Sequence, residues 1–169
     1  LIDIMLESVK SAVANGVTSI GVNAEDASRT DIEYLIDFSH AAKEAGANRI
    51  RYCDTLGYDT PEVIYRRINK LAEEVKIDIE LHCHNDLGCA VGNSVMGAMG
   101  AVDANVNAYI NTTINGYGER AGNADMVSCI LMLLYGSGNK EHDYELDKLN
   151  LKMFRKIAKY TSNAFNQPL

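Results

Sequence analysis

A short apolar segment recurs along this chain at a nearly constant interval, and this repeat constrains the possible folds more than any other feature. Four such segments cover residues 18–25, 48–55, 77–84 and 106–113, so their starts lie 29 or 30 residues apart. Between them lie segments with apolar residues at helical spacing. Strands that alternate with helices in this way predict parallel βα units. We expect the four strands to be parallel neighbours in chain order, with their carboxyl ends together.

Two architectures use such units, an open doubly wound sheet and a (β/α)8 barrel. The Gly-rich phosphate fingerprint of a dinucleotide-binding sheet is absent, and the even spacing favours the barrel. Four units make half of a barrel that needs eight. The sequence therefore predicts an α/β fold in which residues 1–136 form the C-terminal half of a TIM (β/α)8 barrel, strands five to eight with a preceding helix over 1–15. Residues 137–169 are predicted to be a linker and the helical start of an accessory region.

The other helices are predicted over residues 29–46, 60–75, 88–101 and 123–136. The second of these opens with Thr60 as its N-cap and Pro61 at its first helical position. The third is rich in Gly and Ala, which predicts close packing against its neighbours. The chain begins at Leu1, already inside the first predicted helix, and has no closing signal at its other end. We expect a longer protein, or a complementary subunit, to supply the N-terminal half-barrel.

Composition excludes some classes of function. The net charge of −7 argues against a nucleic-acid partner, and the basic residues of 65–70 and 151–159 are spaced as on solvent-facing helices. No apolar run approaches the roughly 20 residues that span a bilayer, so no membrane partner is expected. No stretch of these residues has the pattern of a signal peptide, so none is expected. The four cysteines form no CxxC pair, which fits a reducing cytoplasm.

Polar residues collect at the carboxyl end of every predicted strand, where barrel enzymes carry their chemistry. The four sets are Asn23, Glu25 and Asp26; Asp54 and Thr55; His82, His84, Asn85 and Asp86; and Asn111, Thr113 and Asn115. Turn and cap preferences are the alternative explanation, and they account well for Asp26, Asp59, Thr60 and Asp86. They do not account for two histidines beside a glutamate at one end of a barrel.

His82 and His84 lie two residues apart on a predicted strand, so their rings share a face. Neutral imidazole is a good ligand for a divalent metal, although an exposed histidine pair is an equally frequent reason for this spacing. Second-shell support is expected from Asn85 or Asp86. The remaining candidates are assigned structural positions. Cys83 is expected to point toward the helices; Cys53 could face the site, but a lone thiol is usually structural. Tyr52 and Tyr109 are expected in the core or helix layer, and His40 and His142 on the surface.

Four motifs then resemble one family in order along successive strands. They are NAEDASRTD, CDTLGY, HCHNDLGCAVGNS and NGYGERAGNADM, and the match covers roughly residues 1–135. The family is the metal-dependent Claisen-condensing synthases, which include homocitrate, 2-isopropylmalate, citramalate and Re-type citrate synthases, with hydroxymethylglutaryl-CoA lyase as a more distant relative. The segment after residue 136 resembles the start of the accessory region that follows the barrel in these enzymes.

The resemblance implies an acyltransferase that condenses acetyl-CoA with a 2-oxo acid held on a divalent metal (Mg, Mn, Zn or Fe) and then hydrolyses the thioester. It implies metal ligation by His82, His84 and Asn123. Contact of the oxo acid with Asn23, Glu25 and Thr55 is also expected, the last two as catalytic residues. The loop glycines Gly116, Gly118 and Gly122 would let backbone approach substrate or coenzyme. The family's Arg and metal-binding Asp of the first strand have no match here, and a homo-oligomer is expected.

The acceptor is the least constrained feature. Homocitrate synthases of lysine biosynthesis typically carry an arginine at the position of Gly21, which speaks against that subclass, whereas GVNAEDASR resembles homocitrate synthases associated with nitrogen fixation. Homocitrate synthase, with 2-oxoglutarate as acceptor, is favoured narrowly over 2-isopropylmalate synthase, with 2-oxoisovalerate. A retro-Claisen lyase is disfavoured by GERAGNA. A catalytically incomplete subunit of a split synthase is disfavoured by the intact histidine pair.

Overall fold

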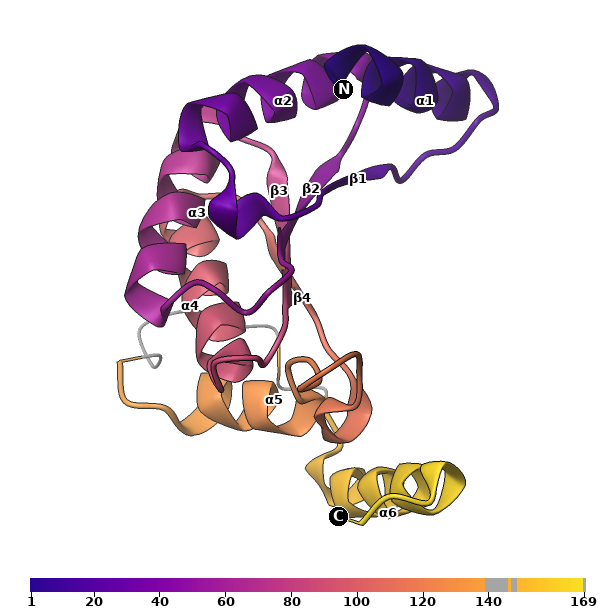
Figure 1. Ribbon diagram of the computed structural model, residues 1–169, viewed down its shortest axis with the longest axis vertical. Helices are drawn as coiled ribbons and strands as arrows, with labels where there is room; N and C mark the ends of the chain where they lie inside the picture. Colours follow the sequence, from indigo (N-terminus) through magenta and orange to yellow (C-terminus); the bar gives the residue numbers. More distant parts are fainter. Residues whose placement is uncertain (139–145, 147–148, 169) are drawn as a thin grey trace.

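The computed structural model describes residues 1–138, 146 and 149–168. Figure 1 shows one sheet with helices along one of its faces and the other face open. The helices are α1 (Ile2–Ala14), α2 (Ile32–Ala45), α3 (Pro61–Val75), α4 (Ala90–Asp103), α5 (Met126–Tyr135) and α6 (Phe154–Phe165). Short 3-10 turns are η1 (Ala27–Arg29), η2 (Ile114–Gly116) and η3 (Leu151–Met153).

The sheet confirms the predicted topology. Strands β1 (Gly21–Ala24), β2 (Arg49–Asp54), β3 (Asp78–Cys83) and β4 (Ala108–Asn111) are all parallel and lie in the order β1-β2-β3-β4. Each strand is shorter than its predicted segment because the residues at both ends leave the ladder for turns. Four consecutive βα units with their carboxyl ends together are the predicted half of a TIM barrel.

The core lies between the sheet and the helices. Ile50 and Tyr52 of β2 and Ile79 and Leu81 of β3 are almost fully buried. They face buried side chains of the helix layer such as Ile64 of α3. Each fully buried aliphatic side chain of this kind stabilises the fold by about 1.5–3 kcal/mol. The opposite faces of the same strands carry polar residues, so that side of the sheet can carry a functional site.

Helix boundaries follow local chemistry. The Asp31 side chain accepts hydrogen bonds from the backbone N–H groups of Glu33 and Tyr34 and so caps α2, which ends at Gly46 in the left-handed region. Pro61 occupies the first turn of α3 as predicted, but Thr60 caps that helix without a side-chain hydrogen bond. The prediction for Thr60 was therefore correct in position only.

The small residues of α4 permit the close packing that their composition predicted. A Cβ atom added at Gly97 would lie 2.6 Å from Leu81 Cδ1, and one at Gly100 would lie 2.6 Å from the Tyr65 carbonyl oxygen of α3. Both distances are too short for a side chain, so α4 approaches β3 and α3 through its glycines.

Helix α6 contacts the rest of the chain through the loop that follows β4. Asn115 Nδ2 donates a hydrogen bond of 3.0 Å to the Ala158 carbonyl, and the rings of Tyr117 and Phe165 meet edge to face at 5.7 Å. The proposed division at residue 136 stays a prediction. None of the helices in the described part of the chain is both long and apolar enough to cross a membrane.

Candidate active site

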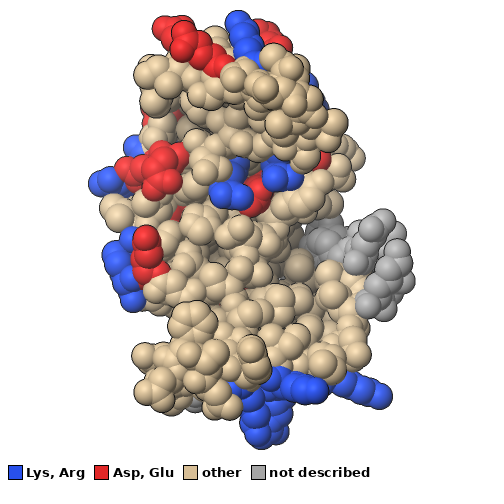
Figure 2. All heavy atoms as spheres, turned by 90° about the vertical axis from the view of Figure 1, so that its right-hand side faces the viewer, with Lys and Arg blue, Asp and Glu red and all other residues tan. Residues whose placement is uncertain are grey.

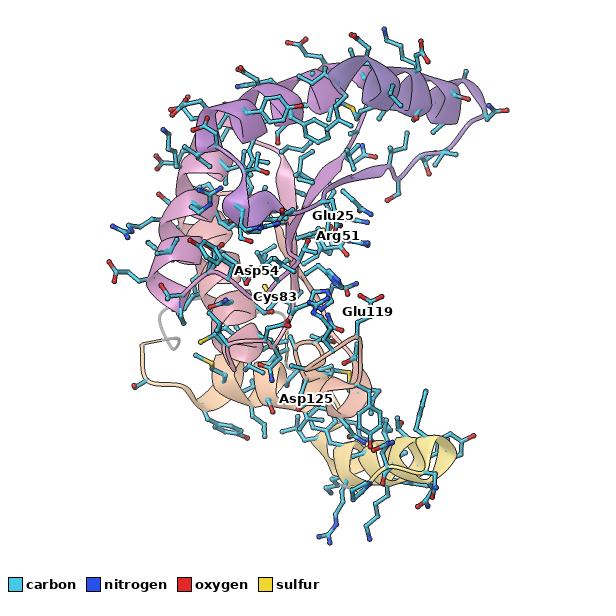
Figure 3. All side chains as sticks on the ribbon, in the orientation of Figure 1. Glu25, Arg51, Asp54, Cys83, Glu119 and Asp125 are labelled. Atoms are coloured by element: carbon cyan, nitrogen blue, oxygen red, sulfur yellow. The ribbon has the colours of Figure 1, made fainter. Side chains whose placement is uncertain are left out.

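Period-two alternation places the predicted site residues on the open face of the sheet. Val22 and Ala24 of β1 are buried toward the helices, whereas Gly21, Asn23 and Glu25 are exposed on the other side. Figure 3 shows Glu25 and Arg51 on this open face and Asp54 and Cys83 on the helix side. We call the inward-facing side of the four strands the inner face.

His82 and His84 lie together on the inner face at the carboxyl end of β3. Their ring centroids are 5.0 Å apart and the rings are nearly perpendicular. His82 Nδ1 lies 2.9 Å from Asn111 Oδ1 of β4. An amide oxygen only accepts, so Nδ1 carries a proton; in the neutral ring the other nitrogen, Nε2, then has the lone pair for a ligand.

His84 is more enclosed than His82 and is 5% exposed. Burial, followed by the neighbouring His82 and Arg120, lowers its pKa, so its ring is neutral at neutral pH. Its Nδ1 is buried without a hydrogen-bond partner among the described residues. A buried ring nitrogen without a partner, beside a second imidazole, fits a divalent metal ion.

Asn123 lies next to His84, as the family pattern implies. The two residues form an isolated antiparallel bridge, and Asn123 Nδ2 donates to the Cys83 carbonyl at 3.4 Å. His82, His84 and Asn123 are thus the residues that would hold a metal. The described part of the chain contains no group of three or more His, Cys, Asp or Glu side chains able to bind one, so an acidic ligand is not supplied by these residues.

The three loop glycines fold the loop around Asn123. A Cβ at Gly118 would lie 1.8 Å from Asn123 Oδ1, and one at Gly122 would lie 2.1 Å from the Gly116 carbonyl oxygen. Gly116 and Gly122 also have positive φ angles of 68° and 91°. These glycines, with Arg120, Phe165 and Gln167, line a pocket of about 670 Å³ between the loop and α6.

Glu25 and Thr55 meet across the ends of β1 and β2. Thr55 Oγ1 donates a hydrogen bond of 2.9 Å to Glu25 Oε1 and accepts one of 2.9 Å from the Asp26 backbone N–H. Cys53 lies beside them on the inner face. Burial, with the nearby Glu25 carboxylate, raises the pKa of its thiol to about 12, which keeps it neutral and supports the structural assignment.

Arg120 joins the ends of three strands and was not singled out from the sequence. Its Nε and NH2 groups donate to the two carboxylate oxygens of Asp86, each at 2.9 Å, and NH2 also donates to the Thr55 carbonyl at 2.5 Å. This bidentate pair holds the pKa of Asp86 below its usual range. Asp86 is therefore an anchor for the loop and not only a turn residue.

A second group missed by sequence reasoning lies behind the site on the helix side. Asn93 Nδ2 donates to Asp54 Oδ2 at 3.1 Å and to the Asp59 carbonyl at 2.7 Å. Tyr52 OH donates to Asp59 Oδ2 at 2.7 Å and accepts from Arg67 Nε at 2.8 Å. Burial is the main cause that raises the pKa of Asp59 to about 6. This network fixes the loop that carries Thr55.

Several sequence interpretations need correction. Tyr109 is not in the core: it lies 44% exposed on the inner face, with the Arg49 guanidinium over its ring. Asn111, not Asn85 or Asp86, supports His82, and Asn85 instead accepts a hydrogen bond from the Ala90 N–H at the start of α4. Asn115 turns away toward α6, and Arg67 is a half-buried structural donor rather than a free solvent-facing charge.

Other structural assignments are confirmed. Cys83 is fully buried against α4, where burial raises the pKa of its thiol, and His40 is exposed. Tyr52 is buried in the helix layer as expected. His142 lies outside the described residues. Asn23 is on the inner face as predicted, and its contact with substrate stays a prediction.

The fold and the site define a class: half of a TIM barrel with an inward-facing histidine pair at the carboxyl end of its strands. A family model described as HMGL-like matches residues 2–160, and the chain belongs to this family. It is 52% identical over 167 residues to a citrate (Re)-synthase of Dehalococcoides mccartyi, covering 98% of this chain and 40% of the relative. It is 39% identical over 170 residues to 2-isopropylmalate synthase 2 of Caldanaerobacter subterraneus, covering 100% and 41%.

Solved structures show the same fold. The HMG-CoA lyase of Bacillus subtilis superposes with a TM-score of 0.75 at 20% identity, over 99% of this chain and 56% of the lyase. The chain spans about two fifths of the length of the curated relatives given above.

Proposed function

We propose that the protein containing this chain condenses acetyl-CoA with a 2-oxo acid and hydrolyses the resulting thioester. The observation that carries the proposal is the inward-facing His82–His84 pair in a half-barrel whose relatives given above are synthases of this type. A divalent metal, when bound there, would polarise the oxo acid's carbonyl group as a Lewis acid.

The chain's own residues then divide the remaining tasks. His82, His84 and Asn123 would hold the metal, and Asn111 orients the His82 ring through its Nδ1. Glu25 and Thr55, already joined by a hydrogen bond, orient the oxo acid beside the metal, with Asn23 below them on the same face. Their fixed geometry supplies the positioning that a bimolecular condensation needs.

The glycine loop is the proposed approach for acetyl-CoA. The pocket between this loop and α6 opens beside Asn123, and its wall carries the cationic side chain of Arg120 and two aromatic ones, Tyr117 and Phe165. The glycines bring backbone to the pocket surface without side chains in the way. An elongated thioester entering here would reach the carboxyl ends of the strands, where the oxo acid is held. A homo-oligomer, expected from the family, belongs to this proposal.

Among acceptors, we favour oxaloacetate, so that the product is citrate. The support is the 52% identity to a citrate (Re)-synthase over nearly the whole chain, compared with 39% to the isopropylmalate synthase. This replaces the narrow preference for homocitrate that the motifs alone suggested.

The test is a substrate panel with the full natural protein that contains these residues. Release of CoA is followed with a thiol reagent after acetyl-CoA is mixed with oxaloacetate, 2-oxoglutarate or 2-oxoisovalerate. The proposal expects metal-dependent CoA release that is fastest with oxaloacetate. Equal release without any oxo acid, or none with all three acids, would contradict it.

A further inference from the structure

A charged cluster occupies the inner face below the histidine pair. Glu80 Oε2 lies 2.7 Å from Arg49 Nε, and Glu80 Oε1 lies 2.7 Å from both Arg51 NH2 and Arg51 Nε. The Glu80 side chain is 8% exposed, whereas those of Arg49 and Arg51 are 25% and 32% exposed. Two guanidinium groups thus share one carboxylate, and the three charges sum to +1. Figure 2 shows basic side chains around an acidic one in the middle of the open face.

The neighbouring residues hold the guanidinium groups in place. The Arg49 guanidinium carbon lies 4.9 Å from the centre of the Tyr109 ring. A Cβ atom at Gly21 would come within 3.3 Å of Arg49 NH2, so the glycine leaves room for this guanidinium on the neighbouring strand. Asn111 Nδ2 lies 3.4 Å from Glu80 Oε1. The arginines are therefore oriented before any ligand arrives, which lowers the entropic cost of binding an anion.

The cluster is placed to meet the far end of a bound acid. Glu80 and His82 are two residues apart on one face of β3, about 6.6 Å along the strand. Asn111 contacts both of them. The next acidic side chain down this face, Asp78, is bonded to Asn107 at 3.2 Å. An acid anchored by its oxo end at the histidines would therefore point its other end at Arg49 and Arg51.

We propose that Arg49 and Arg51 form the subsite for the second carboxylate of a dicarboxylic 2-oxo acid, and so select the acceptor class. The inference rests on the proposed function. Guanidinium groups pair with a carboxylate through charge-assisted hydrogen bonds. A branched apolar tail at the same place would desolvate them without giving a partner, and a site of this kind rejects such an analogue strongly.

The experiment measures binding directly, by calorimetry on the full natural protein loaded with Mn²⁺. The probes are oxaloacetate, with two carboxylates, and 2-oxoisovalerate, with one. Arg49→Gln and Arg51→Gln should each weaken oxaloacetate binding roughly ten- to a hundredfold, the usual effect of losing a hydrogen bond to a charged group. Neither change should weaken the binding of 2-oxoisovalerate. Arg66→Gln, on the exposed surface of α3, is the matched control and should leave both affinities unchanged.

Glu80→Gln separates a binding role from a purely structural one. It keeps the side-chain shape but raises the cluster charge from +1 to +2, so oxaloacetate should bind as tightly as in the wild type or more tightly. If the cluster served only as an ion pair, Glu80→Gln would instead weaken binding as much as the arginine changes, and that result would overturn the subsite. Unchanged oxaloacetate affinity in both arginine variants would overturn it as well. Arginine-dependent binding without any CoA release would support the subsite and reject the proposed condensation.

Discussion

His82 has its tautomer fixed by Asn111, a residue 29 positions further along the chain. This contact exists because β3 and β4 are parallel neighbours in register, with His82 opposite Asn111. A ligand histidine whose proton is held on one nitrogen presents the other to a metal without a tautomer change. His84 lacks such a partner within the described chain, so its orientation depends on burial and on the bridge to Asn123.

Asn111→Ala should therefore weaken metal binding by roughly ten- to a hundredfold, the usual effect of losing such a support. Asn85→Ala is the control, because Asn85 is next to His84 in sequence but bonds the Ala90 N–H at the start of α4 instead. It should cost some stability and leave metal affinity near that of the wild type. Titration of the metal-free proteins with Mn²⁺ measures both. A larger loss for Asn85→Ala would show that the sequence neighbour is the true support.

Asp59 gives a pH-dependent prediction. Its pKa is raised from 3.8 to about 6 in the fold, mainly by burial, so the folded state holds a proton that the unfolded chain has released between these values. Its contribution to stability is thus complete below about pH 4 and is lost as the pH rises through about 6. Asp59→Asn removes this loss and keeps an acceptor for Tyr52. Relative to wild type, the variant should gain on the order of 2–3 kcal/mol between pH 4 and pH 7. Thermal unfolding at both pH values tests this, and a constant difference would contradict it.

At the scale of elements, the glycine loop after β4 positions Asn123 by removing side chains from its surroundings. Gly118 leaves space that Asn123 Oδ1 fills, and Gly122 lies against the Gly116 carbonyl. The loop is anchored at its ends, where the Thr113 N–H donates to the Ala124 carbonyl and the Asn123 N–H donates to the Gly116 carbonyl. The backbone is thus fixed next to His84, while the Asn123 side chain bonds the Cys83 carbonyl.

Gly118→Ala should displace the Asn123 side chain, because the new methyl carbon would lie 1.8 Å from its oxygen. We expect CoA release to fall at least tenfold, with a destabilisation of about 1–3 kcal/mol typical of overpacking. Gly92→Ala is the control: its Cβ would meet only Pro61 Cγ, at 3.2 Å, in a helix far from Asn123 along the chain. Similar activity in the two variants would show that Gly118 does not act through Asn123.

The strands, their order and the helices were predictable because their apolar periodicity is local in the sequence. Alternation likewise placed Glu25, Thr55, His82 and His84 on one face. The partners that complete the site were not predictable in this way. Asn111, Arg120 and Asn93 each act through a residue at least 29 positions distant, and that pairing depends on strand register and loop path. Tyr109 was misplaced because an aromatic residue on an interior strand usually packs, whereas here it supports Arg49.

At the scale of the whole molecule, the sheet formed by the described residues has two unpaired edges. Within that part of the chain β1 and β4 each pair with one neighbour only, and the inner face between them is open in Figure 1. Free parallel edges and an open face favour association with other strands. This is the molecular reason to expect a complementary half-barrel or a second copy of the chain against this face.

Residues 1–169 prepared alone should therefore not persist as a monomer. Sedimentation should show dimers or larger species, because the edges of β1 and β4 are available for pairing. Salt screens exposed charges but not backbone hydrogen bonds between strands, so association should resist moderate salt. A compact monomer of 18.5 kDa that unfolds cooperatively would contradict this expectation.

The most direct test of the account concerns the histidine pair. In the full natural protein, His82→Ala and His84→Ala should each lose bound divalent metal and lower CoA release with acetyl-CoA and oxaloacetate by at least a hundredfold, while unfolding near the wild-type temperature. His40→Ala, on the exposed surface of α2, should behave as the wild type. The measurement is metal content per chain together with turnover on the same samples. If both site variants keep stoichiometric metal and normal CoA release, the pair is not the metal site and the proposed mechanism is wrong.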